Sequence, residues 1–259
     1  MIWQPAGTGM DLNYRRLPDS TAMGIRFSGM GFKFFVGGLL AIVLLIAFAY
    51  LRTWNKTQLE FMIQLNRDLI QISTYGEPPT FAIWLENSQG RLENVYVTRR
   101  AWEGDWEGKP EVPVAIPYWF HLNESGKFSG NQGFLELDAV SGATPREDFF
   151  VIRVDVPSDS TYRFWIEMNL SGDYNDFYRE NDPVNKTSDE FGNGQPALVY
   201  NGIIKVKQGQ IVQPGIVGMS ILADSSGQII HPVSGITSAD EVFSFIQVAV
   251  VRPKPYLIK

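Results

Sequence analysis

The strongest pattern in this chain is an uninterrupted apolar run from Phe34 to Leu51. Its eighteen residues, FFVGGLLAIVLLIAFAYL, carry no charged side chain. A helix rises about 1.5 Å per residue, so the run covers about 27 Å, which is close to the apolar thickness of a bilayer. Because every face of such a helix is apolar, the run predicts a membrane-spanning segment rather than the core helix of a soluble domain.

After this run, apolar and polar residues alternate with the period of two that is typical of half-buried strands. Gln58–Leu65 shows the alternation, although the spacing of Leu59, Met62 and Leu69 leaves a helix over residues 58–73 open. Further strands are predicted at Thr80–Leu85, Leu92–Thr98, Val114–Phe120, Phe149–Val156, Tyr162–Asn169, Ala197–Val206, Gly215–Leu222 and Val242–Val251. Many short strands separated by turn residues predict a mainly β, antiparallel sandwich that follows one transmembrane helix.

The pattern divides the chain into an N-terminal arm of residues 1–33, a transmembrane helix of residues 34–51 and a domain of residues 52–259. Four basic and two acidic residues give the arm a net charge of +2. The whole chain carries −6 and the apolar run is uncharged, so the domain carries −8. An acidic domain is a poor partner for nucleic acid, because phosphate neutralisation supplies most non-specific affinity.

Loop charges favour a cytoplasmic N-terminus, because Arg15 and Arg16 precede the apolar run. This orientation predicts a single-pass protein of a bacterial inner membrane with its C-terminal domain in the periplasm. Ala47-Phe48-Ala49 is similar to the cleavage site of a secretory signal. The length of the apolar run and the thirty-three residues before it favour an uncleaved anchor instead.

The composition limits the chemistry that the domain can perform. The chain has no cysteine, which excludes disulfides, thiolate nucleophiles and cysteine-ligated metal centres within it. No phosphate-cradling loop or dinucleotide fingerprint follows any predicted strand. We therefore predict no cofactor.

Four segments share a recognisable sequence character, namely Phe81–Asn87 with Gly90, Asp138–Thr144, Trp165–Asn169 followed by Asp173–Asp176, and Gly194–Tyr200. Together they resemble an uncharacterised family of bacterial periplasmic domains, which is similar to the immunoglobulin-like module of the flagellar hook-scaffolding protein. The resemblance spans roughly Gln58 to Pro253 and implies an exported, immunoglobulin-like β-sandwich. The family brings no activity with it. The chain departs from the family pattern by keeping an arm and an anchor, which implies a subunit retained at the membrane.

We predict no catalytic site. His121 and His231 are the two imidazoles, and no Gly-x-Ser-x-Gly motif supplies a serine for them to activate. Ser141 lies in Ser-Gly-Ala-Thr and is interpreted as a turn residue. A glycosidase needs two carboxyls at a defined separation, which sequence spacing cannot show for the candidates Glu86, Glu136 and Glu167.

A second candidate site is the acidic connection Ser171–Gln195, whose oxygen-rich side chains could suit calcium. Asp173, Asn175 and Asp176 come nearest to a calcium-binding pattern. Phe177 then stands where a further oxygen ligand is needed, and no glycine follows at the sixth position. We therefore predict no metal, and interpret the connection as a solvated loop or a partner contact.

Partner contacts are predicted at two places. Gly37 and Gly38 would let another transmembrane helix approach closely. Trp102, Trp106 and Trp119 lie near the long connection Glu103–Val112, where they could dock a partner or stack on a sugar ring. Membership of the hydrophobic core is the commoner role of such tryptophans, and that alternative stays open here.

These features predict a non-catalytic accessory subunit of a larger integral-membrane complex of the respiratory or photosynthetic electron-transfer type. Its partners would be membrane protein subunits, contacted through the anchor and the arm, and the lipid bilayer. The alternative function is a membrane-tethered periplasmic module that binds a ligand or glycan through the aromatic residues and the Ser171–Gln195 loop.

Overall fold

The computed structural model describes residues 29–53, 56–103, 115–128, 140–142, 149–184, 187–221 and 227–252. The chain forms two units, one ending at Ala47 and one beginning at Phe48, and each is described by itself. The predicted arm lies outside the described residues up to position 28, so its role stays a prediction.

Helix α1 spans Gly29–Thr53 and contains the predicted apolar run. Its segment Phe34–Leu51 has a mean hydropathy of 2.7 and is long and apolar enough to cross a membrane. The large side chains of this segment are exposed, from Phe34 to Leu51. The helix begins before the apolar run and continues past it, because no proline or strong turn signal interrupts either end.

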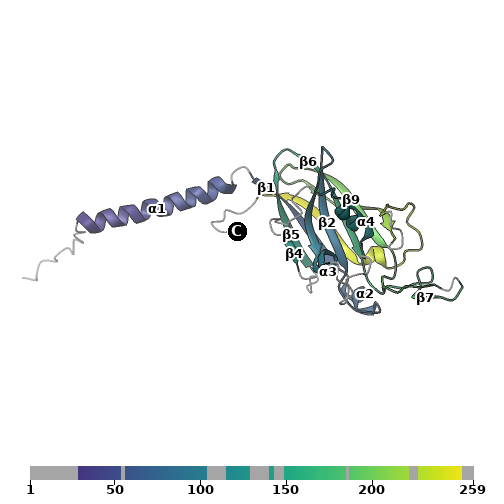
Figure 1. The fold of residues 1–259 in the computed structure, drawn as a ribbon. Helices are drawn as coiled ribbons and strands as arrows, with labels where there is room; N and C mark the ends of the chain where they lie inside the picture. Colours follow the sequence, from purple (N-terminus) through teal and green to yellow (C-terminus); the bar gives the residue numbers. More distant parts are fainter. Residues whose placement is uncertain are drawn as a thin grey trace, which may run out of the picture. The chain divides into compact units, whose positions relative to one another are not determined.

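The described remainder is mainly β and is built around two large sheets (Figure 1). The first sheet has the order β10-β12-β1-β5, with β1 at Lys56–Leu65, β5 at Phe149–Pro157, β10 at Ile211–Val212 and β12 at Phe243–Val251. The second has the order β11-β9-β6-β2-β3-β4, with β2 at Thr80–Asn87, β3 at Leu92–Thr98, β4 at Val140–Gly142, β6 at Thr161–Asn169, β9 at Ala197–Lys205 and β11 at Gly215–Ser220. Every pairing between these strands is antiparallel except that of β3 with β4.

The two sheets pack face to face around the main hydrophobic core. The alternation in β1 places Leu59, Phe61 and Ile63 inside, fully buried. Phe61 meets Phe164 of the opposite sheet edge to face, with ring centroids 5.9 Å apart. Phe81 and Phe243 join the sheets in the same geometry at 5.5 Å. Period-two patterning therefore produces a two-sheet sandwich, as predicted.

A second hydrophobic cluster covers the outer face of the larger sheet. Helix α4, Pro117–Glu124, lies over β2, β6 and β9 there (Figure 1). Trp119 of α4 is buried in this cluster with Trp84 and Trp165, whose rings stack with centroids 6.1 Å apart. The short helix α3, Arg99–Glu103, adds Ala101. This sheet is thus apolar on both faces, which explains the nearly continuous burial along β2.

Three small elements complete the described fold. Helix α2, Arg67–Ile72, is capped by Asn66, whose side chain accepts the backbone N–H of Leu69 at 3.2 Å. Strands β7 at Asn181–Asp182 and β8 at Thr187–Ser188 form a hairpin within the Ser171–Gln195 loop. A 3-10 turn, η1 at Ala239–Glu241, precedes β12.

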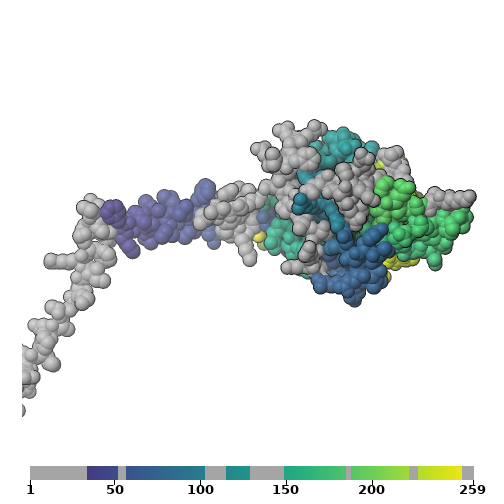
Figure 2. All heavy atoms as spheres, turned by 60° about the horizontal axis from the view of Figure 1, so that its bottom comes forward, coloured from purple at the N-terminus to yellow at the C-terminus, as the bar shows by residue number. Residues whose placement is uncertain are grey.

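The α2 region and the Ser171–Gln195 loop lie next to each other, as the blue and green atoms in Figure 2 show. The backbone N–H of Thr74 donates to the carbonyl of Gly172 at 3.0 Å. The Tyr75 ring lies against Gly172 and Gly192, close enough that a Cβ at either glycine would collide with it. The loop is therefore packed against the domain rather than free in solution.

Two sequence predictions need correction. The strand predicted at Val114–Phe120 is wrong, because residues 117–124 form α4 and Val114 lies outside the described residues. Pro117 stands at the start of the helix, where its fixed φ and missing N–H are tolerated. Residues 58–73 contain both alternatives in turn, since β1 ends at Leu65 and α2 begins at Arg67.

Candidate functional site

The two ends of the Ser171–Gln195 loop are joined by buried hydrogen bonds between Gln195 and Asp173. Asp173 accepts the backbone N–H of Gln195 at 2.8 Å through Oδ1 and the side-chain amide at 3.1 Å through Oδ2. Gln195 Nε2 also donates to the carbonyl of Asp173 at 2.7 Å, and its Oε1 accepts the N–H of Thr237 at 2.7 Å. Gln195 is fully buried. It therefore fixes the base of the loop and the neighbouring segment before η1.

Two further side chains hold the same region in place. Asn169, at the end of β6, donates its amide to the carbonyls of Asn193 and Gln195 at 3.2 and 2.8 Å. Asp189 accepts the backbone N–H groups of Phe191 and Gly192 through Oδ1, and that of Gly194 through Oδ2. These bonds build residues 189–195 into a fixed turn beside the end of the larger sheet.

This turn forms one wall of a cavity of about 340 Å³. The end of the larger sheet supplies Asn169, Ala197 and Ser220, and the loop supplies residues including Asn193 and Phe191. Two buried polar atoms of these lining residues, Oδ1 of Asn169 and Nδ2 of Asn193, have no hydrogen-bond partner. Buried polar atoms without partners are rare in folded proteins, which makes this cavity the candidate binding site.

Beside the cavity, Glu167 anchors α4 to the sheet. Its carboxylate accepts the backbone N–H groups of Tyr118 at 2.9 Å and Trp119 at 2.6 Å, at the N-terminus of the helix. Ser220, which also lines the cavity, donates its hydroxyl to Glu167 at 2.5 Å. A carboxylate from a distant strand thus caps the helix, whose own preceding residue, Ile116, provides no side-chain cap.

Burial raises the pKa of both carboxyl groups of this region. Desolvation raises the pKa of Glu167 to about 7, against the lowering effect of its hydrogen bonds from Ser220, Trp119 and Tyr118. Desolvation likewise raises the pKa of Asp173 to about 7, while the hydrogen bond from the Gln195 backbone lowers it. Such shifts also occur at catalytic sites. Here each carboxyl is occupied by structural donors, so the geometry favours a structural role for both.

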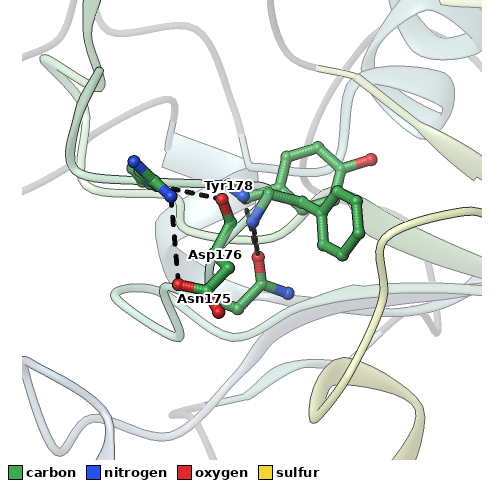
Figure 3. A network of polar contacts seen from close by, with 5 residues as sticks. Asn175, Asp176 and Tyr178 are labelled. Carbon is green, nitrogen blue, oxygen red and sulfur yellow. Dashed lines mark hydrogen bonds and ion pairs between the residues drawn. The ribbon is translucent and has the colours of Figure 1, made fainter. Parts of the chain in front are cut away.

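The three residues nearest to a calcium pattern do not converge. Asp173 faces Gln195, as described above. Asn175 accepts the N–H groups of Phe177 and Tyr178 and donates to the carbonyl of Gly235 at 2.7 Å, while Asp176 is fully exposed beside Arg179 (Figure 3). Among the described residues, no group of three or more His, Asp or Glu side chains could hold a metal ion.

The tryptophans predicted as partner contacts lie in different places. Trp119 is 1% exposed and donates its indole N–H to Asn94 at 2.8 Å, so it belongs to the core, as the alternative interpretation held. Trp102 is partly buried and packs against the same cluster. Trp106 lies outside the described residues, as does most of Glu103–Val112. A Trp119 contact with a sugar or partner loses its basis, because the ring has no accessible face.

The other candidates are also dispersed. Glu86 accepts the indole N–H of Trp165 at 3.0 Å, and Glu136 lies outside the described residues. His121 lies on α4, and His231 is exposed in the segment after β11. Ser141 lies on β4, and its side chain is outside the described part of the chain. Gly37 and Gly38 lie on α1 with open space at their Cβ positions.

The Ser171–Gln195 loop, which supplies one wall of the cavity, was a candidate from the sequence, whereas the sheet residues Asn169 and Ser220 were not. Asn169 and Gln195 belong to two of the four family-like segments, and the structure brings these segments together. Asn193 and Ser220 carry no motif that would single them out. Comparison of the chain with protein-family models, with curated proteins and with solved structures gave no match. The resemblance to the periplasmic family therefore stays a prediction.

Proposed function

We propose that this protein is a non-catalytic, single-pass accessory subunit of a larger integral-membrane complex. The complex would be of the respiratory or photosynthetic electron-transfer type, in a bacterial inner membrane. The N-terminus would be cytoplasmic, and the sandwich, which we propose to be immunoglobulin-like, would cover the periplasmic side of the complex. The observation that carries this proposal is helix α1, whose apolar segment exposes large side chains on every face and needs a nonaqueous environment.

The surface of α1 supports helix packing within a membrane. Gly37 and Ala41 are one turn apart and therefore lie on one face, beside Gly38. A side-chain Cβ built at either glycine meets nothing within 4 Å. Small residues on one face allow the backbones of two helices to approach closely. We propose that this face contacts a helix of the partner complex.

The sandwich supports a structural rather than a catalytic role. The buried carboxyls of its described residues, Glu167 and Asp173, accept hydrogen bonds that close a helix end and a loop. The domain also carries a net charge of −8, a field that would attract a basic periplasmic electron carrier to the complex.

The test is native isolation in mild detergent, followed by mass spectrometry of the proteins that co-migrate with this chain. We expect stoichiometric association with a larger membrane complex, lost when Gly37→Leu and Gly38→Leu are combined. Val43 lies on the opposite face of α1, so Val43→Phe adds bulk there and serves as the matched control. A wild-type chain that migrates alone would overturn the proposal, as would a double leucine variant that stays assembled.

The orientation has its own test, which the absence of cysteine makes straightforward. Gln210 is exposed in the turn before β10, so Gln210→Cys introduces a single accessible thiol. A membrane-impermeant maleimide added to spheroplasts should label it without lysis. Labelling only after lysis would place the domain in the cytoplasm.

The second candidate function is the tethered ligand-binding module. One observation favours it, namely the cavity beside the Ser171–Gln195 loop with its unpartnered amide atoms. Binding at this cavity is compatible with an accessory subunit and can be tested separately.

A further inference from the structure

The cavity described above has the polar groups of a binding site rather than those of a packing defect. Asn169 is 2% exposed and Asn193 is 8% exposed, and both line the cavity. The amide of Asn169 cannot be turned around, because its Nδ2 donates to two backbone carbonyls. Its Oδ1 is therefore an acceptor without a donor, and Nδ2 of Asn193 is a donor without an acceptor. An occupant that both donates and accepts would satisfy the two atoms.

The charge of the lining indicates a neutral occupant. No lysine or arginine is present among the described lining residues. Of the acidic side chains, Asp189 uses both carboxylate oxygens on backbone N–H groups, and Glu190 is exposed at the rim. Within the described lining, an anionic ligand would therefore meet no counter-charge, and a cationic ligand would meet no free buried carboxylate.

The remaining lining residues fit a compact polyhydroxyl molecule. Phe191 and Tyr178 contribute aromatic side chains to the lining and Ser188 a hydroxyl, while the hydroxyl of Ser220 is engaged by Glu167. The Tyr178 ring is held in place because its hydroxyl donates to the carbonyl of Ser234 at 3.0 Å. A volume of about 340 Å³ is at the lower end of the roughly 300–1,000 Å³ found for small-molecule sites. It exceeds by far the share of liquid volume of one water, which is about 30 Å³.

We propose that this cavity binds a neutral polyhydroxyl ligand, a single sugar or the terminal residue of a glycan. One hydroxyl would donate to Oδ1 of Asn169 and another would accept from Nδ2 of Asn193. An apolar C–H face of the sugar would rest against Phe191. The proposal does not rest on the accessory-subunit function, because it uses only residues of the sandwich.

The experiment uses the full-length chain in detergent micelles and isothermal titration calorimetry. The probes are glucose, N-acetylglucosamine and maltose, with choline as a cationic comparison and sulfate as an anionic one. We expect saturable binding of at least one of the three sugars. Asn193→Ala should weaken it at least tenfold, because the variant removes the free donor and leaves the backbone carbonyl that Asn169 needs. Phe191→Ala should weaken it by a similar factor.

The matched control is Asn201→Ala, since Asn201 is a half-buried asparagine of β9 outside the cavity. It should leave the affinity for the sugar unchanged. Thermal unfolding of each variant separates a lost site from a lost fold, and Asn193→Ala should melt at or above the wild-type temperature because it removes an unpartnered buried group. Absence of saturable sugar binding would overturn the proposal. Binding of choline or sulfate alone would overturn the ligand class, and sugar binding unchanged in Asn193→Ala would overturn the site.

Discussion

Gln195 donates both its backbone N–H and its side-chain amide to the carboxylate of Asp173, at 2.8 and 3.1 Å. These residues are 22 positions apart and stand at the two ends of the loop that walls the cavity. Their contact closes the loop into a ring. The position of Asn193 within the loop is therefore set by residues near both ends of the loop. The loop is long, yet its base is held by several buried hydrogen bonds.

Replacing Gln195 should therefore destabilise the domain strongly. We expect Gln195→Ala to lower the free energy of unfolding by about 2–4 kcal/mol, because it leaves the N–H of Thr237 and both Oδ2 and the carbonyl oxygen of Asp173 without the side-chain partner. Urea denaturation of the full-length chain in detergent measures the change. Gln210→Ala is the control at an exposed glutamine and should stay within about 0.5 kcal/mol of wild type. Equal effects of the two substitutions would contradict a closure of the loop by Gln195 and Asp173.

Stability should fall as the pH rises towards neutrality. Burial raises the pKa of Glu167 from 4.5 and that of Asp173 from 3.8, both to about 7. Between the unfolded and folded pKa values, the folded protein keeps protons that the unfolded chain has released. The stabilising contribution of these protons to the free energy of unfolding is therefore complete below about pH 4 and is lost as the pH rises through 7. Each group adds a slope of up to about 1.4 kcal/mol per pH unit.

Denaturation of the full-length chain at about pH 5, 6, 7 and 8 checks this slope. Ser220→Ala removes a hydrogen bond that lowers the pKa of Glu167, so the loss of stability should extend to higher pH in this variant. A free energy of unfolding that increases from pH 5 to pH 7 would contradict the direction of both shifts.

Trp119 and Phe120 are adjacent residues that should respond very differently to truncation. Trp119→Ala empties a core position and removes a hydrogen bond to Asn94, which should cost about 3–5 kcal/mol. Phe120 is 36% exposed on the other side of α4, and Phe120→Ala should cost less than about 1 kcal/mol. Thermal melts of the two variants make the comparison. Similar costs would show that α4 does not pack as described.

Gly194 and Gly90 form a matched pair of glycines, with φ of +73° and +75°. Alanine at either position is strained by the left-handed backbone, at a cost of about 1 kcal/mol or more. A Cβ at Gly194 would in addition collide with Oδ1 of Asp173, whereas a Cβ at Gly90 meets nothing within 4 Å. We expect Gly194→Ala to cost clearly more than Gly90→Ala in urea denaturation. The reverse order would contradict the close contact between Gly194 and Asp173.

The strands could be predicted from the sequence wherever one face of a strand is buried. Leu92–Thr98 has the predicted bounds, and β1 differs from its prediction only by two extra residues at its start. The alternation is visible because water and core impose opposite demands on successive side chains. Val114–Phe120 failed because a run of apolar and aromatic residues does not distinguish a short buried helix from a strand. Pro117, with Trp119 and Leu122 three residues apart, was the signal for α4.

The candidate site was much harder to predict from the sequence. Asn169 and Asn193 are 24 positions apart, and Glu167 and Ser220 are 53 apart. No local periodicity predicts such hydrogen bonds, because they depend on which strands become neighbours. Conversely, two of the three residues that came nearest to a calcium pattern, Asp173 and Asn175, accept backbone N–H groups of the loop, since carboxylates and amides bind these groups as readily as cations. Trp119 misled for a similar reason, because sequence does not show whether an aromatic ring faces solvent.

The position of β1 has a mechanical consequence. It starts at Lys56, just after α1 ends at Thr53, and it pairs with β12 on one side and β5 on the other. Tension applied through α1 would therefore reach the domain through a strand that is hydrogen-bonded to a neighbour on each side. An edge strand could be peeled away one rung at a time, whereas extraction of β1 would have to shear two ladders together. The domain is therefore joined to its anchor through a strand that resists extraction on both of its sides.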